Sequence, residues 1–140
     1  MTAPEPLETV QRLQRAVNEH DLESLVGCFS PDYRNETPVH PGRGFSGRDQ
    51  VRDNWRQFFR FVPDITAKVI RSAVDGDTVW TEWEHHGTRA DGSEHHMRGV
   101  VIFGIADGLA TWGRFYLEPV EDGGADVNAA VRSQVGADPS

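Results

Sequence analysis

The stretch from Asp75 to Gly108, DGDTVWTEWEHHGTRADGSEHHMRGVVIFGIADG, contains three Asp-Gly pairs at sixteen-residue intervals, at 75–76, 91–92 and 107–108. Asp-Gly is a strong signal for the tight turn of a β-hairpin, because such turns need backbone angles that these residues tolerate. Polar and apolar residues alternate between the pairs, as in half-buried strands. The sequence therefore predicts an antiparallel meander with strands near 64–74, 78–88, 94–105 and 109–119.

The residues before the meander have the periodicity of helices. Apolar residues recur every three or four positions over about residues 5–18, and again after Asp21, which stands at an N-cap position. A third helix is predicted where Ser46 and Asp49 have capping-box spacing, and Pro63 ends it. We therefore expect three helices before the sheet.

These elements combine into one domain. A short strand is expected at about residues 33–37, between the second and third helices. We predict an α+β fold in which the three helices cover one face of a curved antiparallel sheet and leave a cone-shaped cavity. The cone domain is assigned to residues 1–120. Residues 121–140 lack periodicity and are predicted to form a flexible tail.

The composition restricts the class of function. The 140 residues are 37% hydrophobic, which suffices for one core. A formal net charge of −8 has the wrong sign for neutralising phosphates, so no nucleic acid partner is expected. No membrane span or secretory signal is recognisable, so we expect a cytoplasmic protein. Cys28 is the only cysteine, which excludes an internal disulfide.

The register of the meander decides which side chains line the cone, because a shift of one residue exchanges the two faces. A three-residue loop at the second Asp-Gly pair places Trp83 opposite Gly99, and a two-residue loop at the third places Phe103 opposite Trp112. The inner face then carries Val79, Thr81, Trp83, His85, Met97, Val101, Phe103, Trp112, Arg114 and Tyr116. The tripeptide Ala-Asp-Gly occurs at both turns, so the sequence does not require the two loops to differ in length. Loops of equal length would place His85 and Arg114 on opposite faces of the sheet.

The order of helix, helix, Tyr33-Arg34-Asn35, capped helix and meander resembles the nuclear transport factor 2-like superfamily, in its SnoaL-like branch. The resemblance covers roughly residues 5–120. This superfamily includes polyketide cyclases, ketosteroid isomerases, limonene-epoxide hydrolases, dehydratases and non-catalytic binding proteins. The resemblance therefore implies the cone fold but leaves the function open.

The limonene-epoxide hydrolases offer one residue-level comparison. Their Tyr-x-Asn matches Tyr33 and Asn35, which by this resemblance are polar groups of the pocket. Their catalytic Arg-x-Asp falls on Trp83 and His85, and their second catalytic Asp falls on Arg114. We therefore reject epoxide hydrolysis. In SnoaL-like cyclases the general acid or base is an aspartate of this strand region, and His85 takes its place here.

Two residues are the candidates for chemistry. In an apolar cone, His85 would be neutral near pH 7 and able to accept a proton. Arg114 would hold a developing enolate or a carboxylate through its planar guanidinium group. The alternatives are a structural histidine in the sheet and an ion pair between Arg114 and Glu118.

Aromatic and polar residues around the cone are predicted to bind the substrate, a small apolar carbonyl or polycyclic compound. Ordinary strand polarity and core packing are the competing interpretations of these residues. The predicted set is Tyr33, Asn35, Trp55, Phe59, Trp83, Phe103, Trp112 and Tyr116.

The histidine doublets at 85–86 and 95–96 suggest zinc. Alternation along the strands sends the members of each doublet to opposite faces, which leaves two imidazoles on each face. Glu84 or Glu94 would have to supply a further ligand. We expect no metal and no cofactor.

The outer face of the last two strands is predicted to be apolar, with Val100, Ile102, Phe115 and Leu117. Exposed apolar faces are usually covered, and by the resemblance this one pairs two copies into a homodimer. The sequence thus favours a cofactor-independent cyclase, isomerase or hydratase. A binding module without chemistry and a dimeric scaffold with a filled cone are the alternatives.

Overall fold

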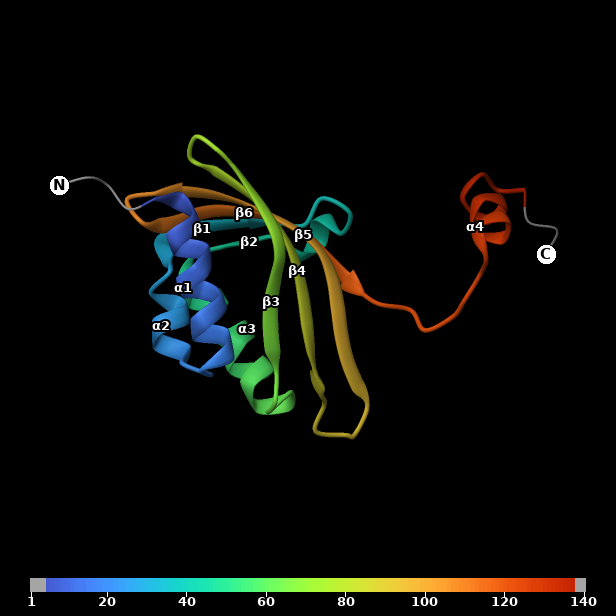
Figure 1. Cartoon of the computed structure of the whole chain (residues 1–140), viewed down its shortest axis with the longest axis horizontal. Helices are drawn as coiled ribbons and strands as arrows, with labels where there is room; N and C mark the ends of the chain where they lie inside the picture. The colour runs from blue at the N-terminus through green and yellow to red at the C-terminus, as the bar shows by residue number, and fades with distance from the viewer. Residues whose placement is uncertain (1–4, 138–140) are drawn as a thin grey trace.

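The computed structural model, which describes residues 5–137, packs three helices against one face of a six-stranded sheet (Figure 1). The elements in chain order are α1 (Pro6–Asn18), α2 (Leu22–Val26), β1 (Phe29–Glu36), a 3₁₀ turn (Pro41–Arg43), β2 (Phe45–Ser46), α3 (Arg48–Phe61), β3 (Thr66–Asp75), β4 (Thr78–Thr88), β5 (Glu94–Ala106), β6 (Leu109–Pro119) and α4 (Val127–Gln134). The predicted α+β class and the three N-terminal helices are confirmed. Within the described residues no helix is both long and apolar enough to cross a membrane.

The sheet is mixed rather than purely antiparallel. Its strand order is β2-β1-β6-β5-β4-β3. The predicted meander of β3 to β6 is antiparallel throughout, but β1 pairs with β6 in parallel. The two-residue strand β2, which the sequence analysis did not predict, extends the edge beside β1.

The helices are positioned by caps and by contacts to the sheet. The Asp21 side chain accepts from the backbone N–H of Ser24, which confirms the predicted N-cap of α2. The capping box predicted for α3 is wrong, because Gly47, with φ +92°, is its N-cap and no side chain caps it. The Asn18 side chain at the end of α1 bonds both the N–H and the C=O of Ala67, which ties α1 to β3.

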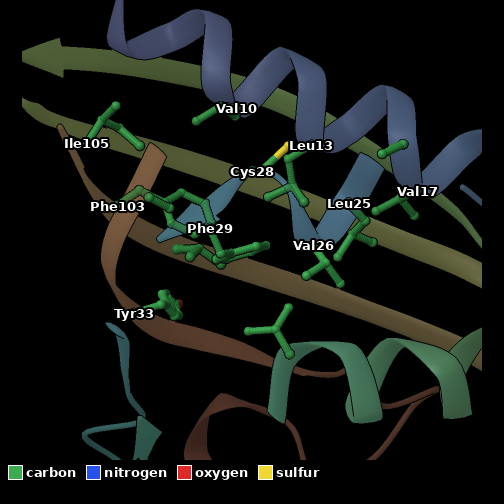
Figure 2. Close-up of a cluster of buried hydrophobic side chains, with 14 of the residues drawn as sticks. Val10, Leu13, Val17, Leu25, Val26, Cys28, Phe29, Tyr33, Phe103 and Ile105 are labelled. Carbon is green, nitrogen blue, oxygen red and sulfur yellow. The ribbon is translucent and has the colours of Figure 1, made fainter. Parts of the chain in front are cut away.

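The core lies between the helices and the sheet. Figure 2 shows Val10, Leu13 and Val17 on the inner side of α1, above residues of α2 and the sheet. Cys28 is buried there. Such packing removes apolar surface from water, which is the main favourable contribution to folding.

The first of the two critical turns has the predicted geometry. Gly92 has φ +90°, and Arg89 and Ser93 close the three-residue loop through a backbone hydrogen bond of 2.8 Å. Trp83 consequently faces Gly99. The register between β4 and β5 therefore agrees with the prediction along the whole hairpin.

The second turn has the predicted loop but a different register beyond it. Asp107 and Gly108, with φ of +52° and +75°, form the expected two-residue loop. Thr111 is then an extra residue on β6, so that Gly104 rather than Phe103 lies opposite Trp112. Such a bulge moves every later side chain of the strand to the other face. The predicted pairing of Phe103 with Trp112 is therefore wrong.

This shift corrects the faces of β6. Trp112, Arg114 and Tyr116, which were predicted to face the cone, lie on the outer side of the sheet. Phe115 and Leu117, which were predicted to lie outside, pack against the core. The physical reason is that the indole ring of Trp112 packs directly on the backbone of Gly104. A residue with a side chain could not be accommodated there, because its Cβ would lie 1.8 Å from Nε1 of Trp112.

The predicted tail contains a helix. The helix α4 lies away from the body of the domain (Figure 1). Its Val127, Val131 and Val135 recur every four residues and are exposed. That spacing is helical, and the sequence analysis overlooked it in a segment dominated by Gly, Ala and Asp.

Candidate functional site

The cone contains two adjoining cavities. The inner chamber, of about 40 Å³, is lined by Leu13, Val17, Phe29, Trp55, Trp83, His85, Val101, Phe103, Phe115 and Leu117. The outer chamber, of about 240 Å³, is lined by Phe29, Tyr33, Asn35, Thr37, Arg43, Phe45, Val51, Asn54, Trp55, Phe58, Met97, Phe115 and Leu117. Four residues, Phe29, Trp55, Phe115 and Leu117, line both chambers, so the two chambers adjoin.

His85 is the only titratable residue of the inner chamber. It is 9% exposed, and its ring meets those of Trp83 and Trp55 edge-on, at centroid distances of 5.7 and 5.8 Å. No hydrogen bond to its ring is formed within residues 5–137. Burial, and secondarily the charge of His95, lowers the pKa of His85 to about 4. The ring is therefore neutral at pH 7.

Two polar groups beside His85 on the inner face, those of Trp83 and Thr81, are already paired. Nε1 of Trp83 donates to Oγ1 of Thr81 over 2.7 Å. The Thr81 hydroxyl in turn donates to the carbonyl of Val101 over 2.6 Å. The strands thus pair these two donors, and the imidazole of His85 is left without a hydrogen-bond partner in the described chain.

Two amide side chains line the outer chamber as hydrogen-bond donors. Tyr33, which is fully buried, donates its hydroxyl to Oδ1 of Asn35 over 2.9 Å. Gln50 donates to Oδ1 of Asn54 over 2.8 Å. In both asparagines the carbonyl oxygen is engaged, and within the described chain neither amide nitrogen has an acceptor. The chamber therefore offers two N–H₂ groups to a ligand.

The structure brings together some of the predicted site residues and separates others. His85, Trp55, Trp83 and Phe103 line the inner chamber, and Tyr33 and Asn35 line the outer one. Phe59 lines neither, and it packs on the ring of His20 at a centroid distance of 5.1 Å.

Arg114 lies on the other side of the sheet from His85. Its guanidinium group is half-exposed and pairs with Glu36 on the parallel strand β1, with 3.5 Å between Nε and Oε2. Trp112 and Tyr116 lie on the same outer side, two residues before and after it. The expectation that His85 and Arg114 share a cavity is wrong, and the partner of Arg114 is Glu36 rather than Glu118.

His95 is a residue near the site to which sequence analysis gave no role. It pairs with Gly87, so it lies on the inner face beside His85, which pairs with Met97. It is 6% exposed, and its Nε2 atom has no hydrogen-bond partner in the described chain. Burial lowers its pKa as well. Strand alternation in the sequence already places His85 and His95 on one face, and this pattern could have identified His95 as a residue of the site.

An open groove of about 750 Å³ adjoins the cone between α3 and the β4–β5 hairpin. It is lined by Asn54, Gln57, Phe58, Phe61, Val62, Arg89, Ala90, Asp91 and His95. Asn54 and Phe58 line both this groove and the outer chamber. The groove therefore gives solvent a route toward the cone.

Comparisons with known proteins agree with this geometry. Residues 10–112 match the family model described as the SnoaL-like domain. Wild-type IdmH from Streptomyces antibioticus, a candidate polyketide cyclase, is similar with 24% identity and a TM-score of 0.71, over 95% of this chain and 99% of that chain. An LEH-like epoxide hydrolase from M. tuberculosis has 19% identity and a TM-score of 0.71, over 83% of this chain and 84% of that chain. These two structures establish the fold alone, and no curated protein matches the sequence.

Proposed function

The chain belongs to the SnoaL-like domain family, and from this premise we propose that it binds a small apolar carbonyl compound in the cone and moves a proton on it without a cofactor. One observation carries the proposal. His85 has a neutral ring without a hydrogen-bond partner in the described chain, in a chamber whose other described lining residues carry no titratable group. Burying such a ring costs stability, and a ligand's polar group would offset that cost.

In the proposed reaction His85 acts as the base. Its imidazole takes a proton from the carbon next to the carbonyl group, so that a C–H bond breaks and an N–H bond forms. The electron pair moves to the carbonyl oxygen, which becomes an enolate. The N–H₂ groups of Asn35 and Asn54, together with the guanidinium group of Arg43, line the outer chamber and are donors for that oxygen. Return of the proton to a different atom completes an isomerisation. In a cyclisation the enolate carbon instead attacks a second carbonyl carbon of the same molecule, and His85 gives its proton to the oxygen of that carbonyl.

Arg114 has no part in this scheme, because the sheet separates it from the cone. Among the described residues no arginine or lysine lines the inner chamber, and Arg43 lines the outer one. A growing negative charge beside His85 would instead favour the protonated ring and raise its pKa during the reaction.

The size of the chambers limits the ligand. Pockets for drug-sized ligands usually measure about 300–1,000 Å³. The outer chamber, at about 240 Å³, is smaller than that, and the inner chamber beside His85, at about 40 Å³, has room only for the reacting end of a ligand. The volume supports a monocyclic or short-chain ketone better than a polycyclic compound.

Binding without chemistry is the second candidate function, and the low pKa of His85 favours it. A general base works best when its pKa lies near the operating pH. A pKa of about 4 makes the empty site a weak base at pH 7. The two candidates share the binding site and differ only in whether a proton leaves the ligand.

The test combines binding with isotope exchange. Monocyclic ketones, with bicyclic and polycyclic ketones for comparison, are screened by thermal shift, since a ligand at 100 times its Kd stabilises the fold by about 2.7 kcal/mol. Ligands that bind are incubated in D₂O, and deuterium uptake beside the carbonyl is measured by mass spectrometry. We expect a monocyclic ketone to bind and to take up deuterium with the wild-type protein, and the uptake to be lost in His85→Ala.

Arg114→Ala is the matched control, because it removes a charged side chain from the outer face, and it should exchange deuterium as the wild type does. Binding without uptake would identify the protein as a binding module. If no ketone binds, or if His85→Ala exchanges as fast as the wild type, the proposal is wrong.

A further inference from the structure

The outer face of the β4–β5 hairpin brings together two histidines and a glutamate. His86 on β4 lies directly opposite His96 on β5, and Glu94 is two residues before His96 on the same face. These three face away from the cone, while His85 and His95 face it. The register of the hairpin therefore creates a second cluster, separate from the candidate site for the carbonyl compound.

The potential ligand atoms of this cluster converge. Nε2 of His86 is 3.2 Å from Oε1 of Glu94, and Nδ1 of His96 is 3.9 Å from the same oxygen. One ligand atom from each residue can be chosen so that all three lie within 4.8 Å of one another. Bonds of about 2.0–2.2 Å to a tetrahedral zinc ion separate ligand atoms by roughly 3.3–3.6 Å. Small rotations of exposed side chains are enough to reach that spacing.

A fourth residue holds His96 in the orientation that metal binding requires. Nε2 of His96 donates to Oε2 of Glu84 over 2.8 Å. In a bond between an imidazole and a carboxylate, the imidazole N–H donates and the carboxylate oxygen accepts. The proton of a neutral His96 is therefore on Nε2, and the lone pair is on Nδ1, on the side of Glu94. Histidines that bind metals usually donate their other nitrogen to a carboxylate in this way.

We propose that His86, Glu94 and His96 bind one Zn²⁺ ion, with Glu84 as the positioning residue and solvent at the fourth position. Two imidazoles and a carboxylate suit zinc, whereas Mg²⁺ and Ca²⁺ prefer six or more oxygen ligands. The ion would link β4 to β5 near the end of the hairpin. It would stabilise the strands whose inner faces carry His85 and His95.

The side chains are accessible for this role. Those of His86 and Glu94 are about half-exposed, and His96 is more buried between them and Glu84. The backbones beneath are fixed, because β4 and β5 pair continuously from Thr78 to Thr88. A zinc ion therefore needs to order only surface side chains.

The experiment measures zinc binding by the full chain after treatment with a chelator. Isothermal titration should give one Zn²⁺ per chain, with affinity in the micromolar range or tighter, and zinc should raise the melting temperature. His96→Ala should abolish both effects. Glu84→Gln should weaken binding by about tenfold to 100-fold, as changes to such supporting carboxylates usually do. Mg²⁺ should not compete.

His40→Ala is the matched control. His40 and Glu118 form a separate histidine–glutamate pair, with 2.7 Å between Nε2 and Oε1. This variant should bind zinc as the wild type does. Melting curves in chelator show whether each variant folds, and NMR signals of the His86 and His96 rings should shift on zinc addition. Absence of one-to-one binding by the wild type, or unchanged binding by a folded His96→Ala, would overturn the proposal.

Discussion

At the scale of single residues, His85 combines a functional opportunity with a cost in stability. Its ring is buried and has no hydrogen-bond partner in the described chain, and an unpaired buried polar group usually costs about 1–3 kcal/mol. Residues that lower the stability of the folded protein are frequently retained because its function requires them. A structural histidine would instead be expected to pair its nitrogens, as Trp83 pairs its indole N–H with Thr81.

The first prediction concerns the stability of His85→Leu as a function of pH. At pH 7 we expect the variant to be at least as stable as the wild type, by up to about 1 kcal/mol, because leucine fills a similar volume without a polar atom. The folded pKa of about 4 lies below the ordinary value of 6.5, so the unfolded chain binds more protons between these values. Wild-type stability is therefore complete above about pH 6.5 and falls as the pH drops toward 4.

The contribution of His85 to this loss is at most roughly 3 kcal/mol, since one pKa unit corresponds to about 1.4 kcal/mol. His85→Leu should lose less stability over the same pH range. Urea denaturation at several pH values between 4 and 7, with a chelator present, measures both curves. Parallel curves for the two proteins would show that the ring is not held neutral by burial. A large loss of stability at pH 7 would point to a structural role.

At the scale of elements, the sequence predicted the strands of the meander well and its faces incompletely. The strand ends could be predicted because Asp-Gly pairs favour tight turns, and a tight turn ends one strand and begins the next. The bulge at Thr111 has no such local signal. It depends on the close packing of Trp112 over Gly104 across the hairpin, a contact between residues that only the folded sheet brings together.

The residues of the candidate site could be predicted where the strand register could be predicted, and not beyond the bulge. His85 depended on the hairpin between β4 and β5, whose register the turn determines, and its inward direction was predicted. Arg114 depended on the next hairpin, beyond the bulge, and its direction was wrong. Asn54 lies on α3 and reaches the cone through helix packing, for which the sequence contains only the periodicity of the helix.

The prediction at this scale is that Gly104 determines the register of β6. An added Cβ at this position would collide with the ring of Trp112. Gly104→Ala should therefore lower the free energy of unfolding by about 1–3 kcal/mol, the usual cost of overpacking. Chemical denaturation measures this change. Gly42→Ala is the control, because a Cβ there meets no atom within 4 Å. Equal stability of the two variants would contradict this account of the bulge.

At the scale of the whole molecule, the corrected register still leaves an apolar patch on the outer face, beside charged residues such as Glu82, Arg98 and Arg114. Trp80 on β4 lies opposite Ile102 on β5, and Trp112 and Tyr116 on β6 share that side of the sheet. Trp80 is 49% exposed. A large aromatic side chain beside other apolar groups favours burial against a partner, and a second copy of the same face is the simplest one. The residues of this face differ from those predicted, but the reason for expecting a homodimer is unchanged.

The last prediction is that Trp80→Lys converts a homodimer into a monomer. Two charges introduced near the centre of a symmetric interface would both have to be desolvated, which is far more costly than burying tryptophan. Sedimentation equilibrium should show a dimer for the wild type and a monomer for the variant at the same concentration. Phe61→Lys is the control, because Phe61 is also about half-exposed but lies on α3, in the groove beside the cone. That variant should remain dimeric, whereas Phe115→Glu should destabilise the fold itself, since Phe115 faces the core. A monomeric wild type, or a dimeric Trp80→Lys, would mean that the outer face does not join two copies.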